Sequence, residues 1–276
     1  MSAETPIAEI AAALEAHLRS FPAPIIVAFS GGVDSTVVAK AATVALGAEA
    51  IVSATAKSES NTDEDVDLCR AIAVEHGLNL RVVEYSELAI PNYANNPTNR
   101  CYFCKSELYT RLTQMARHEG FASILDGSNA DDVGDYRPGL VAVKENGVRS
   151  PLRELAINKA TVRALALHYG LPNHDKPASP CLSSRVPYGQ PITREKLDQI
   201  AAAERYLRGL GLREFRCRHH GDVARIEAHA EDFPLLLQHR DAIVAEFRRI
   251  GFLWTAMDLA GFKSGGLNVL VNRKAG

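Results

Sequence analysis

The chain has 276 residues, of which 46% are apolar and 23% are charged, a composition typical of a globular protein with one large or two modest domains. Its formal net charge of −2 excludes a globally basic surface, so we expect no nucleic acid partner. No apolar run reaches the length of a membrane span and the N-terminus has no signal-peptide pattern, which predicts a cytoplasmic protein with no membrane partner. Five cysteines, an odd number, favour thiol chemistry over a disulfide framework.

The first half of the chain alternates helical and strand-like segments. Apolar residues at helical spacing predict a helix from Ile7 to Leu18. The strands that we predict after it are 25–29, 50–54, 80–84 and 122–126, and the helices are 36–42, 62–76 and 105–119, with Asn61 or Thr62 as the N-cap of the second. This alternation predicts an α/β fold with a doubly wound parallel sheet, whose ligands bind at the carboxyl ends of the strands.

The second half begins with a proline-rich stretch. Five prolines between positions 172 and 191 block helix continuation and predict a fixed loop or linker. Beyond it we expect a helix capped by Thr193, strands at 215–218 and 223–227, a helix at 242–249 and a short strand at 253–256. We therefore predict three segments: a domain at 1–172, a loop at 173–192 and a smaller α+β unit at 193–276.

A glycine pair lies where the first strand turns into a helix. In such a turn the free backbone N–H groups and the positive end of the helix dipole form an anion site. The loop lacks the lysine of a Walker-type motif, and its aspartate is well placed to act through Mg²⁺ on nucleotide phosphates, although an acidic residue there also complements the helix dipole. The residues of this predicted cradle are Ser30, Gly31, Gly32, Val33, Asp34 and Ser35.

Three further candidates follow the other strands. The backbone at Ala54 is placed to recognise adenine, although a plain loop fits nearly as well. Gly127 belongs to the polar run 126–132 after the fourth strand, where we expect nucleotide contacts. Arg137 can bind a triphosphate or a substrate carboxylate bidentately.

Cys181 is the second strong signal. It lies in a proline-bounded, serine-rich loop with Arg185 four residues on, and neighbouring basic side chains favour the nucleophilic thiolate. The alternative is a small buried hydrophobic residue, which such a loop fits poorly.

Cys101 and Cys104 form a Cys-x-x-Cys pair. One pair alone does not make a structural zinc site, but with Cys181 it supplies three corners of an iron–sulfur cluster. A redox pair, or two helix cysteines with no joint role, is the alternative. Cys69 and Cys217 are expected to be packing residues.

The C-terminal unit is locally basic. Alternation places Arg216 and Arg218 on one face of a strand, where they can hold a substrate phosphate, although a solvated face is an equal alternative. Glu227 can pair with these arginines or bind a metal.

Taken together, the loop 30–35, the runs 126–132 and 135–139, and the segments 180–185 and 187–189 resemble the ATP-dependent sacrificial sulfur transferases of the LarE family, within the N-type ATP pyrophosphatases. The resemblance implies an adenine nucleotide alpha hydrolase-like fold. It also implies that ATP adenylylates a carboxylate of pyridinium-3,5-biscarboxylic acid mononucleotide, for the nickel-pincer nucleotide cofactor of lactate racemase. Cys181 then forms a thioester, and Arg185, Arg216, Arg218 and Glu227 serve the substrate.

The same resemblance leaves two routes for the sulfur. In one branch Cys181 gives up its own sulfur and becomes dehydroalanine. In the other, which we favour, Cys101, Cys104 and Cys181 hold a [4Fe-4S] cluster that carries it. The implied cofactors are ATP, Mg²⁺ and this cluster, the C-terminal unit binds substrate and other subunits, and the protein forms a homo-oligomer, often a hexamer.

Three other functions compete with this one. A tRNA thiolase of the same superfamily also uses cysteines, but the near-neutral charge argues against it. An NAD synthetase-like amidoligase needs no cysteine nucleophile. A nucleotide-sensing module would keep the loop and leave Cys181 unexplained.

Overall fold

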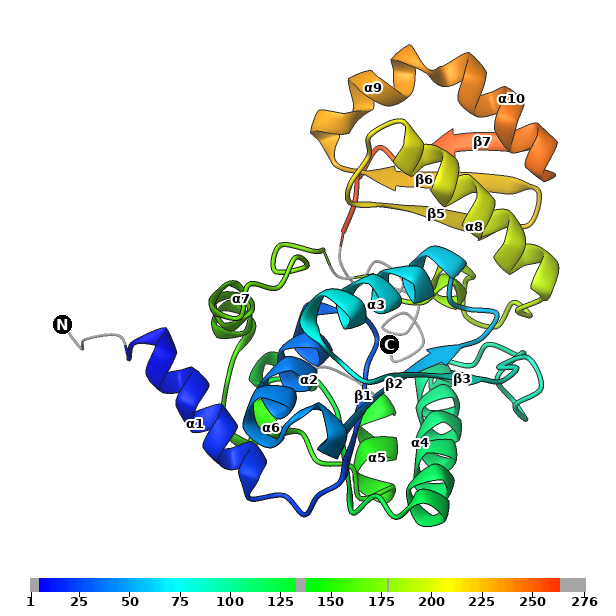
Figure 1. Cartoon of the computed structure of the whole chain (residues 1–276). Coiled ribbons are helices and arrows are strands. Elements are labelled where there is room, and N and C mark those ends of the chain that lie inside the picture. The colour runs from blue at the N-terminus through cyan, green and yellow to red at the C-terminus, as the bar shows by residue number, and fades with distance from the viewer. Residues whose placement is uncertain (1–4, 133–137, 178, 264–276) are drawn as a thin grey trace, which may run out of the picture. The chain divides into compact units, whose positions relative to one another are not determined.

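The computed structural model describes residues 5–132, 138–177 and 179–263 (Figure 1). These residues divide into two compact units, one made of residues up to 85 and from 101 to 178, the other of residues 86–100 and from 179 onward. Each unit has its own hydrophobic core. No described helix is long and apolar enough to cross a membrane.

The first unit is built on a four-stranded parallel sheet with strand order β3-β2-β1-β4. The strands are β1 (Ile25–Ala28), β2 (Ile51–Lys57), β3 (Leu80–Glu84) and β4 (Ser123–Leu125). Its helices are α1 (Ile7–Arg19), α2 (Val33–Leu46), α3 (Asp63–His76), α4 (Arg100–Glu119), α5 (Pro138–Glu145), α6 (Pro151–Glu154) and α7 (Lys159–His168), with short 3₁₀ helices η1 (Ala48–Ala50) and η2 (Ala130–Asp132). The prediction of a doubly wound parallel sheet is confirmed.

Helices cover both faces of this sheet because its strands are apolar on both sides. Ile25 and Val27 of β1 pack with buried residues of α1, α2, α3 and α7, whereas Ile26 packs with α4 and α5 on the opposite face. All three side chains are fully buried. Alternate residues of one strand therefore fill two cores, which is the pattern of a central strand.

Local sequence signals set the helix ends. Thr62 caps α3 by accepting a hydrogen bond from the Asp65 backbone N–H, and the Asp65 carboxylate accepts one from the Thr62 backbone N–H, which is a capping box. Thr193 likewise caps the first helix of the second unit. Both caps confirm the sequence prediction. Helix α4 begins at Arg100, five residues earlier than predicted, so Cys101 and Cys104 lie in its first turns.

The second unit is a three-stranded sheet with helices against one face. Strand β5 pairs antiparallel with β6, and β6 pairs parallel with β7. Its elements are η3 (Leu182–Arg185), α8 (Arg194–Gly209), β5 (Phe215–His220), β6 (Val223–Ala228), η4 (Ala230–Asp232), α9 (Phe233–Gln238), α10 (Arg240–Ile250) and β7 (Trp254–Met257). Cys217, Ala224 and Ile226 face the core with α8 and α10, so the alternate residues of β5 and β6 face away from it.

Candidate functional site

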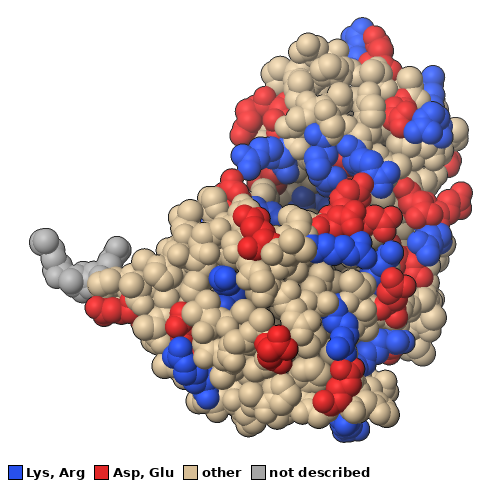
Figure 2. Space-filling view, in the orientation of Figure 1, with Lys and Arg blue, Asp and Glu red and all other residues tan. Residues whose placement is uncertain are grey.

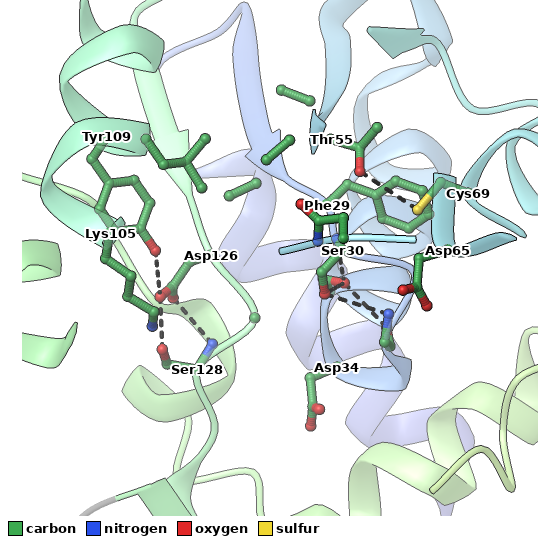
Figure 3. Close-up of a pocket in the computed structure, with 18 of the residues that line it drawn as sticks. Phe29, Ser30, Asp34, Thr55, Asp65, Cys69, Lys105, Tyr109, Asp126 and Ser128 are labelled. Carbon is green, nitrogen blue, oxygen red and sulfur yellow. Dashed lines mark hydrogen bonds between the residues drawn. The ribbon is translucent and has the colours of Figure 1, made fainter. Parts of the chain in front are cut away.

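The first unit contains a cavity of about 280 Å³ at the carboxyl ends of β1, β2 and β4 (Figure 3). Ligands of open α/β sheets bind at this edge. Of the predicted nucleotide-binding residues, the cavity is lined by Ser30, Gly32, Asp34, Ser35, Ala54 and Gly127. The structure therefore brings together side chains and backbone from three separate strand ends.

The loop after β1 forms an open anion cradle. Gly31 has φ of +68°, a left-handed conformation that glycine adopts without strain. Gly32 is the N-cap of α2, and no side chain caps this helix. Its first backbone N–H groups, from Val33 onward, therefore have no intrahelical acceptor and point toward the end of the helix, where an anion can bind.

Hydrogen bonds within the loop fix its shape. The Ser35 hydroxyl, which is buried, donates to the Gly32 carbonyl at 3.1 Å and accepts from the Ser30 backbone N–H at 3.2 Å. Asn173 closes the loop from outside, since its amide donates to the Gly31 carbonyl at 3.0 Å. A preformed loop of this kind does not have to reorganise when a phosphate binds.

The loop after β4 packs directly on this cradle. A Cβ atom at Gly127 would lie 2.6 Å from the Ser35 backbone nitrogen and 2.8 Å from its Cα. Real Cβ atoms do not approach backbone that closely, so only glycine allows this contact. Gly127 is therefore required at the site for close packing.

Asp34 is held by two side chains from outside its own helix. Asn129 donates to one carboxylate oxygen at 2.9 Å, and the Lys159 ammonium pairs with the other. Lys159 is the first residue of α7, whose N-cap is Asn158. The cradle thus has a lysine nearby although its own sequence has none, and distance along the chain hid this from the sequence analysis. The Asp34 carboxylate lines the cavity and is the type of oxygen ligand that suits Mg²⁺ beside nucleotide phosphates.

The opposite wall of the cavity lies on the left in Figure 3. It carries Lys105 and Tyr109 of α4, which the motifs did not indicate, and Asp126 with Ser128 from the polar run predicted after β4. Asp126 is buried and accepts hydrogen bonds from the hydroxyls of Ser128 at 2.6 Å and Ser150 at 2.7 Å. Burial, and then the Asp126 charge, raise the pKa of Tyr109 above its usual range, so its hydroxyl stays protonated. The wall therefore presents one ammonium and several fixed hydroxyls.

Cys69 of α3 also lines the cavity. It is buried and accepts a hydrogen bond from the Thr55 hydroxyl at 3.5 Å. Burial raises its pKa, which favours the neutral thiol. The packing role expected for Cys69 is thus borne out, and Cys217, which is fully buried, agrees with its own prediction.

In the second unit, Cys181 is the N-cap of the 3₁₀ helix η3. Arg185, at the end of η3, is buried and makes a bidentate pair with Glu204, with both bonds at 2.8 Å. Its third nitrogen donates to the carbonyls of Pro180 and Cys181. These contacts make Arg185 a clamp on the backbone that carries the cysteine, and its role toward substrate stays a prediction.

The face of β5 and β6 that is turned away from the core is cationic. Arg218 donates to Glu227 at 2.7 and 2.9 Å and to the Ser184 carbonyl at 2.8 Å, which ties this face to η3. Arg216 lies opposite Glu227 in the sheet register. Burial, and then the nearby Arg185 charge, lower the pKa of Arg216 to about 10. Positive charges held this close together repel one another, and a bound anion relieves that repulsion.

The remaining candidates belong to different units or lie outside the described residues. Cys101 and Cys104 belong to the first unit and Cys181 to the second. Neither unit, in its described residues, contains a group of three His, Cys, Asp or Glu that could hold a metal ion. Arg137 lies outside the described residues.

Comparison with known proteins gives one family model and several relatives. Residues 7–115 match the family model described as NAD synthase. The chain is 41% identical over 244 residues to the pyridinium-3,5-bisthiocarboxylic acid mononucleotide synthase of Lactiplantibacillus plantarum, covering 88% of each chain. It is also 47% identical to an uncharacterised protein of Synechocystis, covering 90% of this chain and 93% of that one. An uncharacterised protein of Methanocaldococcus jannaschii is 28% identical over 87% of this chain and 91% of its own.

Proposed function

Because the chain belongs to the family of pyridinium-3,5-bisthiocarboxylic acid mononucleotide synthases, the LarE family, we propose that it is an ATP-dependent sulfur transferase. Its substrate is pyridinium-3,5-biscarboxylic acid mononucleotide, and the product is the corresponding thiocarboxylate. The observation that carries the proposal is a phosphate cradle in one unit, with no lysine in its own loop, combined with a partly exposed cysteine in the other unit whose backbone Arg185 holds.

The first half-reaction activates the carboxylate. A substrate carboxylate oxygen attacks the α-phosphorus of ATP, the bond to the β-phosphate oxygen breaks, and pyrophosphate leaves. The first-turn N–H groups of α2 and the Ser35 region receive the pyrophosphate charge as it develops. Positive charge near the phosphates comes from two lysines. Lys159 pairs with Asp34, and Lys105 lines the opposite wall of the cavity. Mg²⁺ bound at Asp34 would neutralise phosphate charge.

The second half-reaction transfers sulfur. The Cys181 thiolate attacks the acyl carbon, AMP leaves and a thioester forms. In the sacrificial route the Cys181 Cα proton goes to a base and the Cβ–S bond breaks, leaving dehydroalanine on the protein and the thiocarboxylate on the substrate. In this route each protein molecule reacts once.

We favour the alternative route, in which Cys101, Cys104 and Cys181 hold a [4Fe-4S] cluster. Thiolates are the donors that iron prefers, so these three cysteines would hold the cluster, and the cluster would supply the sulfur that is transferred to the substrate. Intact-mass measurement after turnover separates the two routes. Loss of one H₂S from the chain supports the sacrificial route, whereas unchanged mass with repeated turnover, abolished in Cys101→Ala, supports the cluster.

The substrate phosphate is assigned to the cationic face that carries Arg216 and Arg218, with Glu227 holding Arg218 in place. The three predicted segments, 1–172, 173–192 and 193–276, correspond in this proposal to the ATP domain, the cysteine loop and the substrate-binding and assembly unit. A cytoplasmic homo-oligomer, with the hexamer as its expected form, is part of the same proposal.

The activity is tested by pyrophosphate release from ATP in the presence of pyridinium-3,5-biscarboxylic acid mononucleotide. The proposal requires release that depends on this substrate and is independent of ammonia. An NAD synthetase-like amidoligase would instead release pyrophosphate in an ammonia-dependent reaction. The match to the NAD synthase family model ends at residue 115 and does not include Cys181. Figure 2 shows basic and acidic side chains interspersed over the described residues on the visible face of the first unit. A tRNA thiolase would be favoured only if the protein bound tRNA in a salt-sensitive way.

A further inference from the structure

The segment between β3 and α4 has buried polar side chains to which the proposed function gives no role. Residues 86–100 belong to the second unit, together with the cysteine loop, although they lie some eighty positions before it in the chain. Four of its polar side chains are almost fully buried: Glu87, Tyr93, Asn96 and Arg100. Buried polar groups at this density require specific partners, and Tyr93, Asn96 and Arg100 have theirs on the turn that follows Cys181.

Two of these side chains hold the backbone of that turn. The Asn96 amide donates to the carbonyls of Val186 and Pro187 at 3.1 and 2.8 Å. Arg100 donates to the Ser183 carbonyl at 2.9 Å. Asn96 has φ of +52°, a left-handed conformation that asparagine tolerates better than most residues. The backbone after Cys181 is thus fixed from outside its own segment.

A third contact reaches a side chain of the turn itself. The Tyr93 hydroxyl donates to a Glu87 carboxylate oxygen at 2.6 Å and lies 2.7 Å from the Ser183 hydroxyl. The Tyr93 hydroxyl has one proton, which it donates to Glu87, so Ser183 must donate to Tyr93. The chain of donors therefore runs in one direction, from Ser183 through Tyr93 to the buried Glu87 carboxyl group.

Cys181 lies close enough to this chain to affect it. Burial raises the pKa of Tyr93 far above its usual range, and the next causes are repulsion from Cys181 and from Glu87. Tyr93 is therefore a permanent neutral donor within the electrostatic range of the cysteine. None of these residues lines the cavity of the first unit.

We propose that Tyr93 and Glu87 are positioning residues for sulfur delivery, which fix the orientation of the Cys181 turn through Ser183. This inference rests on the proposed function, and it predicts that the two half-reactions depend on different residues. Because the ATP cavity is formed by other residues, loss of the Tyr93 hydroxyl should impair thiolation and leave adenylylation intact.

The test compares Tyr93→Phe with Tyr169→Phe. Tyr169 also donates to a glutamate, Glu15, at 3.1 Å, but within the first unit, so it is a matched loss of one hydroxyl. In Tyr93→Phe, thiocarboxylate formation is expected to fall about 10- to 100-fold, while substrate-dependent pyrophosphate release stays at the wild-type rate. Tyr169→Phe should keep both. An equal fall in both half-reactions of Tyr93→Phe, or in neither, would overturn the inference.

A second measurement does not depend on the proposed substrate. Iodoacetamide alkylation of Cys181 is followed by peptide mass spectrometry in chelator-treated protein, with the exposed Cys101 as an internal reference. Loss of one hydrogen bond to the turn should raise the Cys181 rate about fivefold relative to Cys101 in Tyr93→Phe, and not in Tyr169→Phe. An unchanged ratio would overturn the inference even if the protein proved to act on another substrate.

Glu87→Gln is a second, more conservative variant that tests the inference if Tyr93→Phe does not fold. Glutamine keeps the volume and one acceptor oxygen for Tyr93, so we expect this variant to retain the wild-type alkylation ratio within about twofold. If Glu87→Gln folds and raises the ratio of the Cys181 to the Cys101 alkylation rate about fivefold, an acceptor oxygen at position 87 is not sufficient. That result would contradict the hydrogen-bonded chain from Ser183 through Tyr93 to Glu87. Wild-type protein that releases no pyrophosphate with the pyridinium substrate would overturn the proposed function alone.

Discussion

A Cβ atom placed on Gly127 would lie 2.6 Å from the backbone nitrogen of Ser35. The two residues are far apart in sequence, and their contact joins the end of β4 to the first turn of α2, where the phosphate cradle is. Since the obstacle is backbone, it cannot rotate away as a side chain would.

We therefore expect Gly127→Ala to push the two loops apart and to lower pyrophosphate release at least about tenfold. Gly209→Ala is the matched control. A Cβ there would meet nothing within 4 Å, and Gly209 ends helix α8, where alanine is the better helix former. Steady-state pyrophosphate assays on both variants, with thermal unfolding, make the comparison. Wild-type activity in Gly127→Ala would contradict the packing argument.

Lys159 is the cation that the loop sequence lacks. Replacing it with methionine keeps most of the side-chain volume and leaves Asp34 with Asn129 as its remaining partner described above. We expect Lys159→Met to lower pyrophosphate release by about one to two orders of magnitude, with the Cys181 alkylation rate unchanged. A faster Cys181 alkylation in this variant would indicate a folding defect and not a local electrostatic role.

The buried pair between Arg185 and Glu204 predicts a stability effect in the second unit. Glu204→Gln leaves a buried guanidinium without its counter-charge, and removing one partner of such a pair typically costs about 3–5 kcal/mol. The free energy of unfolding should fall by this amount in urea titrations. Glu246→Gln, at a surface pair with Arg249, is the control and should leave the free energy of unfolding close to that of the wild type.

Glu154 predicts a pH dependence. A hydrogen bond from Arg149, with smaller help from His17, lowers the Glu154 pKa from 4.5 to about 2. A lowered folded-state pKa means that the carboxylate stabilises the fold above pH 4.5 and that this contribution is lost as the pH falls toward 2. The difference in unfolding free energy between wild type and Glu154→Gln, roughly 1 kcal/mol at neutral pH, should shrink over that range. A difference that is constant from pH 6 to about pH 3 would contradict the assignment.

The sequence predicts the first unit well because its signals are local. Apolar strands, the Thr62 cap and the glycine pair each act over a few residues, and the structure confirms the strands, the cap and the parallel sheet. Helices α5, α6 and α9 are too short, with eight, four and six residues, to give a clear periodic pattern. Helix α7 is missed although Asn158 caps it.

The site is less predictable because its supporting contacts are long-range. Lys159 reaches Asp34 from 125 positions away, and Tyr93 reaches Ser183 from 90 positions away. Neither partner carries a motif of its own, so only the folded chain shows that residues 86–100 support the cysteine loop.

The central claim, that ATP activates a substrate carboxylate which Cys181 then attacks, is tested most directly with Cys181→Ala. Pyrophosphate and thiocarboxylate are measured together in a single turnover with ATP and pyridinium-3,5-biscarboxylic acid mononucleotide. We predict that the variant releases pyrophosphate as the wild type does and forms no thiocarboxylate. Thiocarboxylate formation at the wild-type rate in Cys181→Ala would contradict the account.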